Sequence, residues 1–132
     1  MYGVIIMSYE LPINNSADFW LKLDQLVTTS KLKIDRPKGT SHPRYPSLIY
    51  PLDYGYLEDT RSGDRDNIDV WLGSLSGKAV TAFICSVDLE KRDTEIKILV
   101  GCTYQESREI LNIHNIGFQS AILLVRDEVV AV

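Results

Sequence analysis

The sequence predicts a small α+β fold that is mainly β. Three features support this: helical patterns near both ends, a middle stretch rich in proline and glycine, and several apolar runs with β-branched residues. At 132 residues the chain is long enough for a single domain, residues 1–132, with its own core. We expect a mainly antiparallel sheet, closed or strongly curled, with helices near the N- and C-terminal parts.

The first helix is predicted over residues 14–27, NNSADFWLKLDQLV. Asn15 or Ser16 can cap its N-terminus, and Asp18 suits the positive end of the helix dipole. Its apolar side chains fall on one face: Phe19, Leu23, Leu26 and Val27. Before it, residues 2–11 are apolar and are compatible with a strand or an ordered arm, because periodicity does not separate the two.

The middle of the chain predicts extended segments joined by tight turns. Residues 36–56 carry prolines at 37, 43, 46 and 51 and glycines at 39 and 55, which excludes a long helix. Residues 68–75, 79–89 and 95–102 then read as strands. A second helix is predicted over residues 104–115, with Thr103 and Glu106 in a capping-box arrangement. The tail, residues 121–132, predicts a further strand or a segment that packs on a partner.

Composition excludes several classes of function. The net charge is −4, so no basic surface indicates binding to nucleic acid or to an acidic membrane. Cys85 and Cys102 are the only cysteines, and their spacing matches neither a disulfide framework nor a zinc site. The apolar run at residues 4–7 is too short for a membrane span and lacks the features of a signal peptide. We therefore expect a cytoplasmic protein.

Three aspartates are clustered in the segment SGDRDNIDVW, residues 62–71. Asp64, Asp66 and Asp69 have a spacing compatible with Mg²⁺, which binds carboxylate oxygens and completes its coordination with water and substrate phosphates. The alternative is a solvated polar turn between strands, because Asp and Asn are common in turns. Spacing alone leaves both open.

Two further segments in register with these aspartates resemble the family I soluble inorganic pyrophosphatases. Residues 50–56 read YPLDYGY and precede the DRDNID segment at 64–69, and Glu90, Glu95 and Lys97 follow in an acid-x4-acid-x-Lys pattern. Order and spacing match that family over about half of the chain. The resemblance implies an OB-like five-stranded barrel and Mg²⁺-dependent hydrolysis of inorganic pyrophosphate to two phosphates by a metal-activated water.

The resemblance also implies roles for individual residues. It gives Asp66 as the general base, with Tyr54 supporting the nucleophile site. The implied metal ligands are Asp64, Asp69, Glu95 and Glu90. The implied substrate-binding residues, which hold pyrophosphate or a related phosphoanhydride, are Lys31, Arg44, Tyr50 and Lys97.

Several positions depart from that family's pattern. Glu90 and Glu95 stand where the family usually has aspartate, and Lys33 replaces the acid of its Lys-x-Glu segment. His42 stands in register with a family arginine, and His114 lies roughly where a Tyr-Lys pair holds phosphate. The alternative is therefore a catalytically altered OB-like module that binds a phosphate-containing ligand, nucleic acid or protein. We also expect a homo-oligomer, because the apolar tail needs cover.

Overall fold

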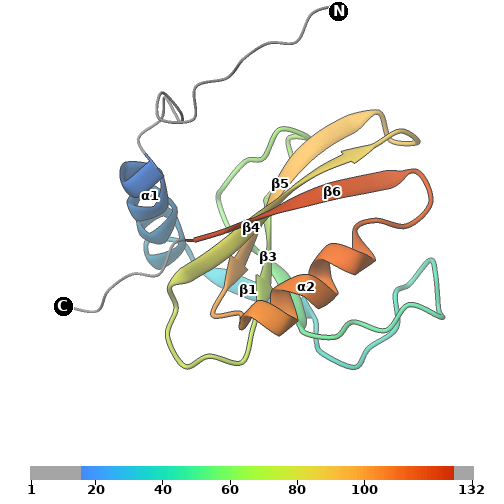
Figure 1. Cartoon of the computed structure of the whole chain (residues 1–132), viewed down its shortest axis with the longest axis horizontal. Coiled ribbons are helices and arrows are strands. Elements are labelled where there is room, and N and C mark those ends of the chain that lie inside the picture. Colours follow the sequence, from blue (N-terminus) through green and yellow to red (C-terminus); the bar gives the residue numbers. More distant parts are fainter. Residues whose placement is uncertain (1–15, 127–132) are drawn as a thin grey trace, which may run out of the picture.

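The computed structural model describes residues 16–126, which form two helices and six strands (Figure 1). In chain order these are α1 (Ser16–Thr28), β1 (Leu32–Arg36), β2 (Asp53–Leu57), β3 (Ile68–Leu72), β4 (Val80–Asp88), β5 (Asp93–Val100), α2 (Tyr104–Ile113) and β6 (Gln119–Val125). The mainly β, α+β prediction is confirmed. Both helices and strands β3, β4 and β5 lie close to their predicted ranges, whereas β1 was not predicted. The apolar N-terminal segment, residues 2–11, lies outside the described residues.

The six strands form one open sheet in the order β1-β2-β3-β5-β4-β6. The expected five-stranded barrel, closed or curled, is therefore wrong in strand number, and the sheet is open rather than closed. The sheet is mainly antiparallel, as expected; the exception is the β3–β5 pair, which is parallel, with Val70 opposite Ile98. The chain passes from β3 to β4 before it returns as β5 between them, and β6 adds to the outer edge of β4. In the described residues, β1 and β6 stay at opposite edges and do not pair.

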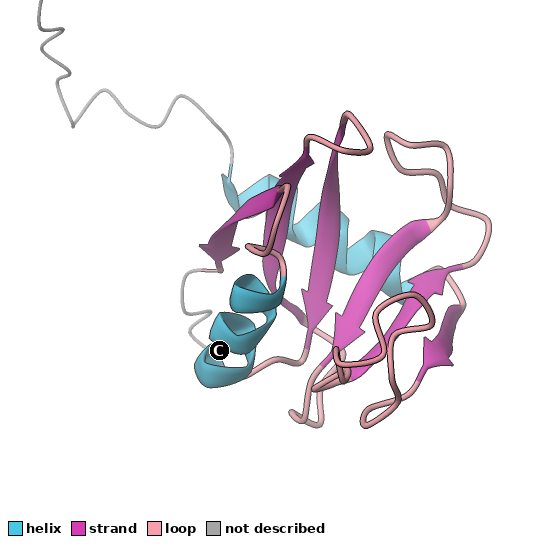
Figure 2. Ribbon diagram, turned by 90° about the vertical axis from the view of Figure 1, so that its right-hand side faces the viewer, coloured by secondary structure: helices cyan, strands magenta, loops and turns pink. Residues whose placement is uncertain are grey.

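The two helices cover opposite faces of the sheet (Figure 2). On the α1 face, Val27 is buried with a core that includes Val70 and Ile98. Trp20 contacts Phe83 of β4, with ring centroids 5.3 Å apart. The predicted helix thus exists, with Asp18 in its first turn, and it buries Trp20 more than the predicted Phe19, which is 43% exposed. Of its two predicted caps, Asn15 lies outside the described residues, and Ser16 is the first residue of the helix.

The α2 face carries the second core and a group of polar side chains. Thr103 and Glu106 form the predicted capping box, and Ile110 of α2 is buried against Trp71 and Leu99. Strand side chains alternate between faces, so residues two apart share one face. Register therefore brings to the α2 face a group of polar and aromatic side chains from three neighbouring strands: Tyr54, Tyr56, Asp69, Trp71, Glu95 and Lys97.

Part of the opposite face is not covered by α1. Val87, Ile96 and Ile122 are 41%, 40% and 62% exposed on neighbouring strands. Of these three residues only Ile122 belongs to the apolar tail, residues 121–132, for which the sequence indicated a need for cover. The homo-oligomer stays a prediction. Residues 127–132 lie outside the described part of the chain. Within residues 16–126, neither helix has the length and apolar character needed to cross a membrane.

Candidate active site

A cleft of about 880 Å³ opens on the α2 face of the sheet. Its floor is the group of strand residues that includes Tyr54, Asp69 and Lys97. One wall is the segment between β1 and β2, which contributes His42 and Tyr45, and the other is the loop after α2, which contributes Phe118. The cleft is thus built from a strand floor and two loop walls.

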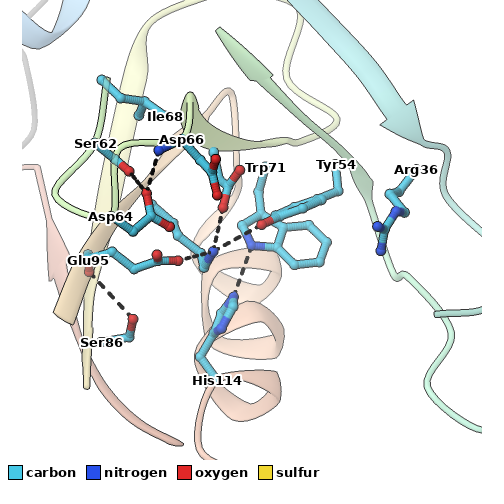
Figure 3. A network of polar contacts seen from close by, with 12 residues as sticks. Arg36, Tyr54, Ser62, Asp64, Asp66, Ile68, Trp71, Ser86, Glu95 and His114 are labelled. Carbon is cyan, nitrogen blue, oxygen red and sulfur yellow. Dashed lines mark hydrogen bonds and ion pairs between the residues drawn. The ribbon is translucent and has the colours of Figure 1, made fainter. Parts of the chain in front are cut away.

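The Lys97 ammonium lies on the floor of the cleft, among three polar groups. Figure 3 shows the polar contacts of this floor, with Tyr54 and Glu95 among the labelled residues. The ammonium is 2.7 Å from an oxygen of Asp69, 2.6 Å from an oxygen of Glu95 and 3.0 Å from the hydroxyl of Tyr54. Burial works against its charge, but Tyr54, Asp69 and Glu95 more than offset this and raise the pKa of Lys97. Lys97 is therefore a fixed cation that two carboxylates compensate.

Tyr54 and Trp71 form the apolar part of the floor. Their ring centroids are 4.5 Å apart, and burial raises the pKa of Tyr54, so its hydroxyl stays protonated. The indole N–H of Trp71 donates to Nε2 of His114 at 3.2 Å, and Nδ1 of His114 lies 2.5 Å from Oε1 of Gln119. Burial, followed by the charge of Lys97, lowers the pKa of His114 to about 4. His114 is thus a neutral, structurally held ring.

Three carboxylates converge beside this floor. Oxygens of Asp64, Asp93 and Glu95 all lie within 4.8 Å of one another, and all three side chains are half-buried. The turn that presents Asp64 is well ordered by its own bonds: the Ser62 hydroxyl donates to Asp64, and the backbone N–H of Asp66 donates to the same oxygen at 3.0 Å. The turn thereby places Asp64 next to Asp93 and Glu95, at the start of β5.

The electrostatics of these carboxylates fit a divalent cation. The Ser62 hydrogen bond holds the pKa of Asp64 below its usual range, whereas burial raises the pKa of Glu95 despite the nearby Lys97. Carboxylates this close repel one another unless a proton or a cation lies between them. Hard oxygen donors are the ligands that Mg²⁺ and similar ions prefer. The residues present therefore suit such an ion. Lys97 already neutralises part of the negative charge, through its ion pair with Glu95.

Arg36, at the end of β1, is one of three cationic residues of the described chain that line the cleft, with Lys91 and Lys97. Its guanidinium donates to the hydroxyl of Tyr50 at 2.8 Å and lies over the same ring, 5.8 Å from its centroid. Within residues 16–126 the Arg36 guanidinium donates this one hydrogen bond. Several of its five N–H donors therefore remain for an anion. Arg36 lines the cleft together with Tyr50.

The structure brings together some of the sequence-predicted site residues. Asp69, Glu95, Lys97 and Tyr54 meet in one network, and Asp64 contacts it through Glu95. Tyr50 and Glu90 also line the cleft, but Glu90 is exposed and is not one of the three converging carboxylates.

Other predicted residues lie apart from this network. Asp66 is exposed in its turn and is not among the cleft-lining residues of the described chain. Lys31 is exposed just before β1. Arg44 is also exposed, with its guanidinium over the ring of Tyr45. In the described structure, Lys31 and Arg44 contact no member of the Lys97 network. Asp66 reaches it only through its backbone N–H, which donates to Asp64.

Two residues of the candidate site were missed by the sequence reasoning, Asp93 and Arg36. Asp93 is the first residue of β5, and its side chain shares a face with Glu95 and Lys97 because strands alternate with period two. That alternation was the signal that could have found it. Arg36 ends the strand LKIDR, where nothing in the local pattern separates it from a solvated arginine.

Comparison with known proteins supports the fold. No protein-family model matches the sequence, and no curated protein matches it significantly. Among solved structures, an inorganic pyrophosphatase from Neisseria gonorrhoeae is similar, with a TM-score of 0.52 at 17% sequence identity. The match covers 71% of this chain and 80% of that chain. At this identity the similarity shows a distant pyrophosphatase-like fold.

Proposed function

We propose that this chain is a divalent-cation-dependent phosphoanhydride hydrolase, with Mg²⁺ as the cation and inorganic pyrophosphate as the first substrate to test. The observation that carries the proposal is the convergence of Asp64, Asp93 and Glu95 beside a cleft that also holds Arg36. A pyrophosphate anion needs both kinds of site, because its own charge repels a nucleophile until cations neutralise it.

Asp64, Asp93 and Glu95 would hold the cation, which when bound supplies charge neutralisation and an acidified water. Lys97 acts through position: its ion pairs fix the carboxylates of Glu95 and Asp69 at the floor. Arg36 would bind a phosphate oxygen through its remaining N–H groups. The attacking water forms the new bond to phosphorus as the bridging P–O bond breaks. The pyrophosphatase resemblance gives its proton to Asp66, which adjoins the carboxylate cluster through its backbone N–H, a donor to Asp64, and this role stays a prediction.

The test is phosphate release from pyrophosphate by the purified chain, with Mg²⁺ and with a chelator. We expect release only with the cation. Asp64→Asn should raise the Mg²⁺ concentration needed for half-maximal rate about tenfold, and excess Mg²⁺ should restore the rate. Asp66→Asn should lower the rate by ~10² to 10⁴, as removal of a general base does, without rescue by Mg²⁺. Calorimetric titration of Mg²⁺ into each variant reports cation binding separately from activity.

Asp59→Asn is the matched control. Asp59 is exposed in the same β2–β3 connection and lies outside the carboxylate cluster, so its amide should leave both rate and cation binding unchanged. A rate that the chelator does not change would refute the metal-dependent mechanism. Rescue of Asp66→Asn by Mg²⁺ would make Asp66 a ligand and remove it as the base.

The second candidate is a module that binds a phosphate-containing ligand without cleaving it. The observation that favours it is the position of Lys97, which already compensates Asp69 and Glu95, two of the acids that the pyrophosphatase resemblance gives to metals. This candidate predicts that pyrophosphate binds but that no phosphate is released with Mg²⁺ or Mn²⁺.

A further inference from the structure

The cleft offers more space, and more apolar surface, than pyrophosphate can use. Its volume of about 880 Å³ lies in the range of pockets that bury organic ligands of drug size. Three of its lining side chains are large, apolar and well exposed: Tyr45 at 52%, Ile116 at 62% and Phe118 at 63%. A small, wholly polar anion gains nothing from such side chains. Their place in the cleft therefore indicates a ligand with an apolar group.

One wall is an aromatic platform built around His42. Nδ1 of His42 accepts backbone hydrogen bonds from Arg44 at 3.0 Å and Tyr45 at 3.1 Å, which fixes the imidazole. The His42 ring stacks on Tyr50 with an interplanar angle of 9° and lies 5.1 Å from the Tyr45 ring. Because Nδ1 accepts, Nε2 carries the proton, and His42 adds a donor to this platform.

The other wall is the loop between α2 and β6. Gly117, at φ +65°, separates Ile116 from Phe118, and the backbone N–H of Leu89 donates to the carbonyl of Phe118 at 3.0 Å. That bond ties the loop to the turn between β4 and β5, so the backbone of Phe118 is fixed while its ring stays exposed. Figure 1 places this loop and the β1–β2 segment on the same side of the molecule, and both line the one cleft.

We propose that the ligand of this cleft is a nucleoside di- or triphosphate, whose base contacts Tyr45 and Phe118 while its phosphates reach Arg36 and the carboxylates. The placement of the phosphates rests on the proposed function, whereas the placement of the base rests on the walls of the cleft. Flat aromatic walls favour a nucleobase, since stacking on aromatic side chains is the general way proteins hold bases. For a diphosphate the reaction adds water across the bridging P–O bond, giving a nucleoside monophosphate and inorganic phosphate.

The experiment compares the binding of ADP, inorganic pyrophosphate and geranyl diphosphate to the full chain by calorimetry at one Mg²⁺ concentration. The three ligands share a phosphoanhydride and differ in the group attached to it. We expect ADP to bind about tenfold more tightly than pyrophosphate. Tyr45→Ala and Phe118→Ala should each weaken ADP binding about 5- to 100-fold, the range for loss of one stacking contact, and change pyrophosphate binding less than twofold.

Tyr104→Ala is the matched control, because Tyr104 is 66% exposed on α2 and does not line the cleft. It should leave all three affinities unchanged. Pyrophosphate binding as tight as ADP binding, or ADP binding that neither wall variant weakens, overturns the inference, as does failure of ADP to bind. If geranyl diphosphate binds more tightly than ADP, the inference is also overturned, and the walls of the cleft hold a lipid chain instead of a nucleobase. Because binding is measured directly, an absence of phosphate release would refute the proposed hydrolysis and leave this inference standing.

Discussion

The floor and the walls of the cleft differ in how firmly the fold holds their side chains. On the floor, the side chain of Lys97 is 9% exposed and is held by two carboxylates and a hydroxyl. On the walls, the rings of Tyr45 and Phe118 are more than half exposed on connecting segments. The difference teaches that this fold fixes the charged groups on strands and leaves the apolar contacts on loops, where substitution is tolerated best.

Loss of Lys97 should have the largest effect, because it is the central ion of the floor. Lys97→Met leaves Asp69 and Glu95 without their cation, and Glu95 is 10% exposed. Removing one partner of a buried pair typically costs about 3–5 kcal/mol. We expect the free energy of unfolding, measured by urea titration at pH 7, to fall by about 3 kcal/mol.

Lys33→Met provides the matched control for Lys97→Met. Lys33 lies on β1 and is exposed, so its loss should change the free energy of unfolding by less than about 0.5 kcal/mol. If Lys97→Met changed the free energy of unfolding as little as Lys33→Met does, the floor network would contribute nothing to folding.

The two histidines allow the pH dependence of stability to be compared between an imidazole on the floor, His114, and one on a wall, His42. His114 is 7% exposed, and burial lowers its pKa to about 4 from 6.5. A lowered pKa means that the folded state favours the neutral ring, so this stability is fully present above pH 6.5 and is lost as the pH falls toward 4. Between pH 7 and pH 5 the wild type should lose roughly 2 kcal/mol that His114→Gln does not lose.

Urea titrations at the two pH values measure this difference. The pKa of His42 is also lowered, by burial and then by Arg36 and Arg44, but its ring lies at the cleft surface. His42→Gln should therefore change the pH dependence in the same direction and by less. A pH dependence that His114→Gln leaves unaltered would mean that the ring takes up its proton without disturbing the floor.

Local patterns in the sequence predicted the elements well. The capping box of Thr103 and Glu106 begins α2 as expected, and the apolar runs correspond to β3, β4 and β5. What local patterns could not provide was the order of strands. The parallel contact of Val70 with Ile98 joins segments far apart in the chain, and no turn signal specifies it. Because the order of strands was not predictable, neither was the position of β6 at an open edge of the sheet.

The candidate site was predicted in part, for a related reason. Motif spacing selected Glu90, which falls in the turn between β4 and β5, where the strand register pairs Asp88 with Asp93. The carboxylate that converges with Asp64 and Glu95 is Asp93, two residues before Glu95 on the same face. Spacing fixes positions along the chain, but only the strand register decides which of two nearby acids faces the cleft.

The smallest effects on stability are expected on the walls, and they sharpen the comparison most directly. Tyr45→Ser and Phe118→Ser remove rings that are 52% and 63% exposed, so each should change the free energy of unfolding by less than about 0.5 kcal/mol. Tyr54→Phe is the floor counterpart: it removes only the hydroxyl that lies 3.0 Å from Lys97, and loss of that hydrogen bond should cost about 1 kcal/mol.

Urea titration of these three variants under one set of conditions makes the measurement. If a wall variant cost about 2 kcal/mol or more, its ring would belong to the core, and the distinction between floor and walls would fail. If both wall variants fold with wild-type stability, any loss of ligand binding they show arises at the cleft surface itself. The free energy of unfolding and the affinity for ADP then report separately on the two parts of the cleft.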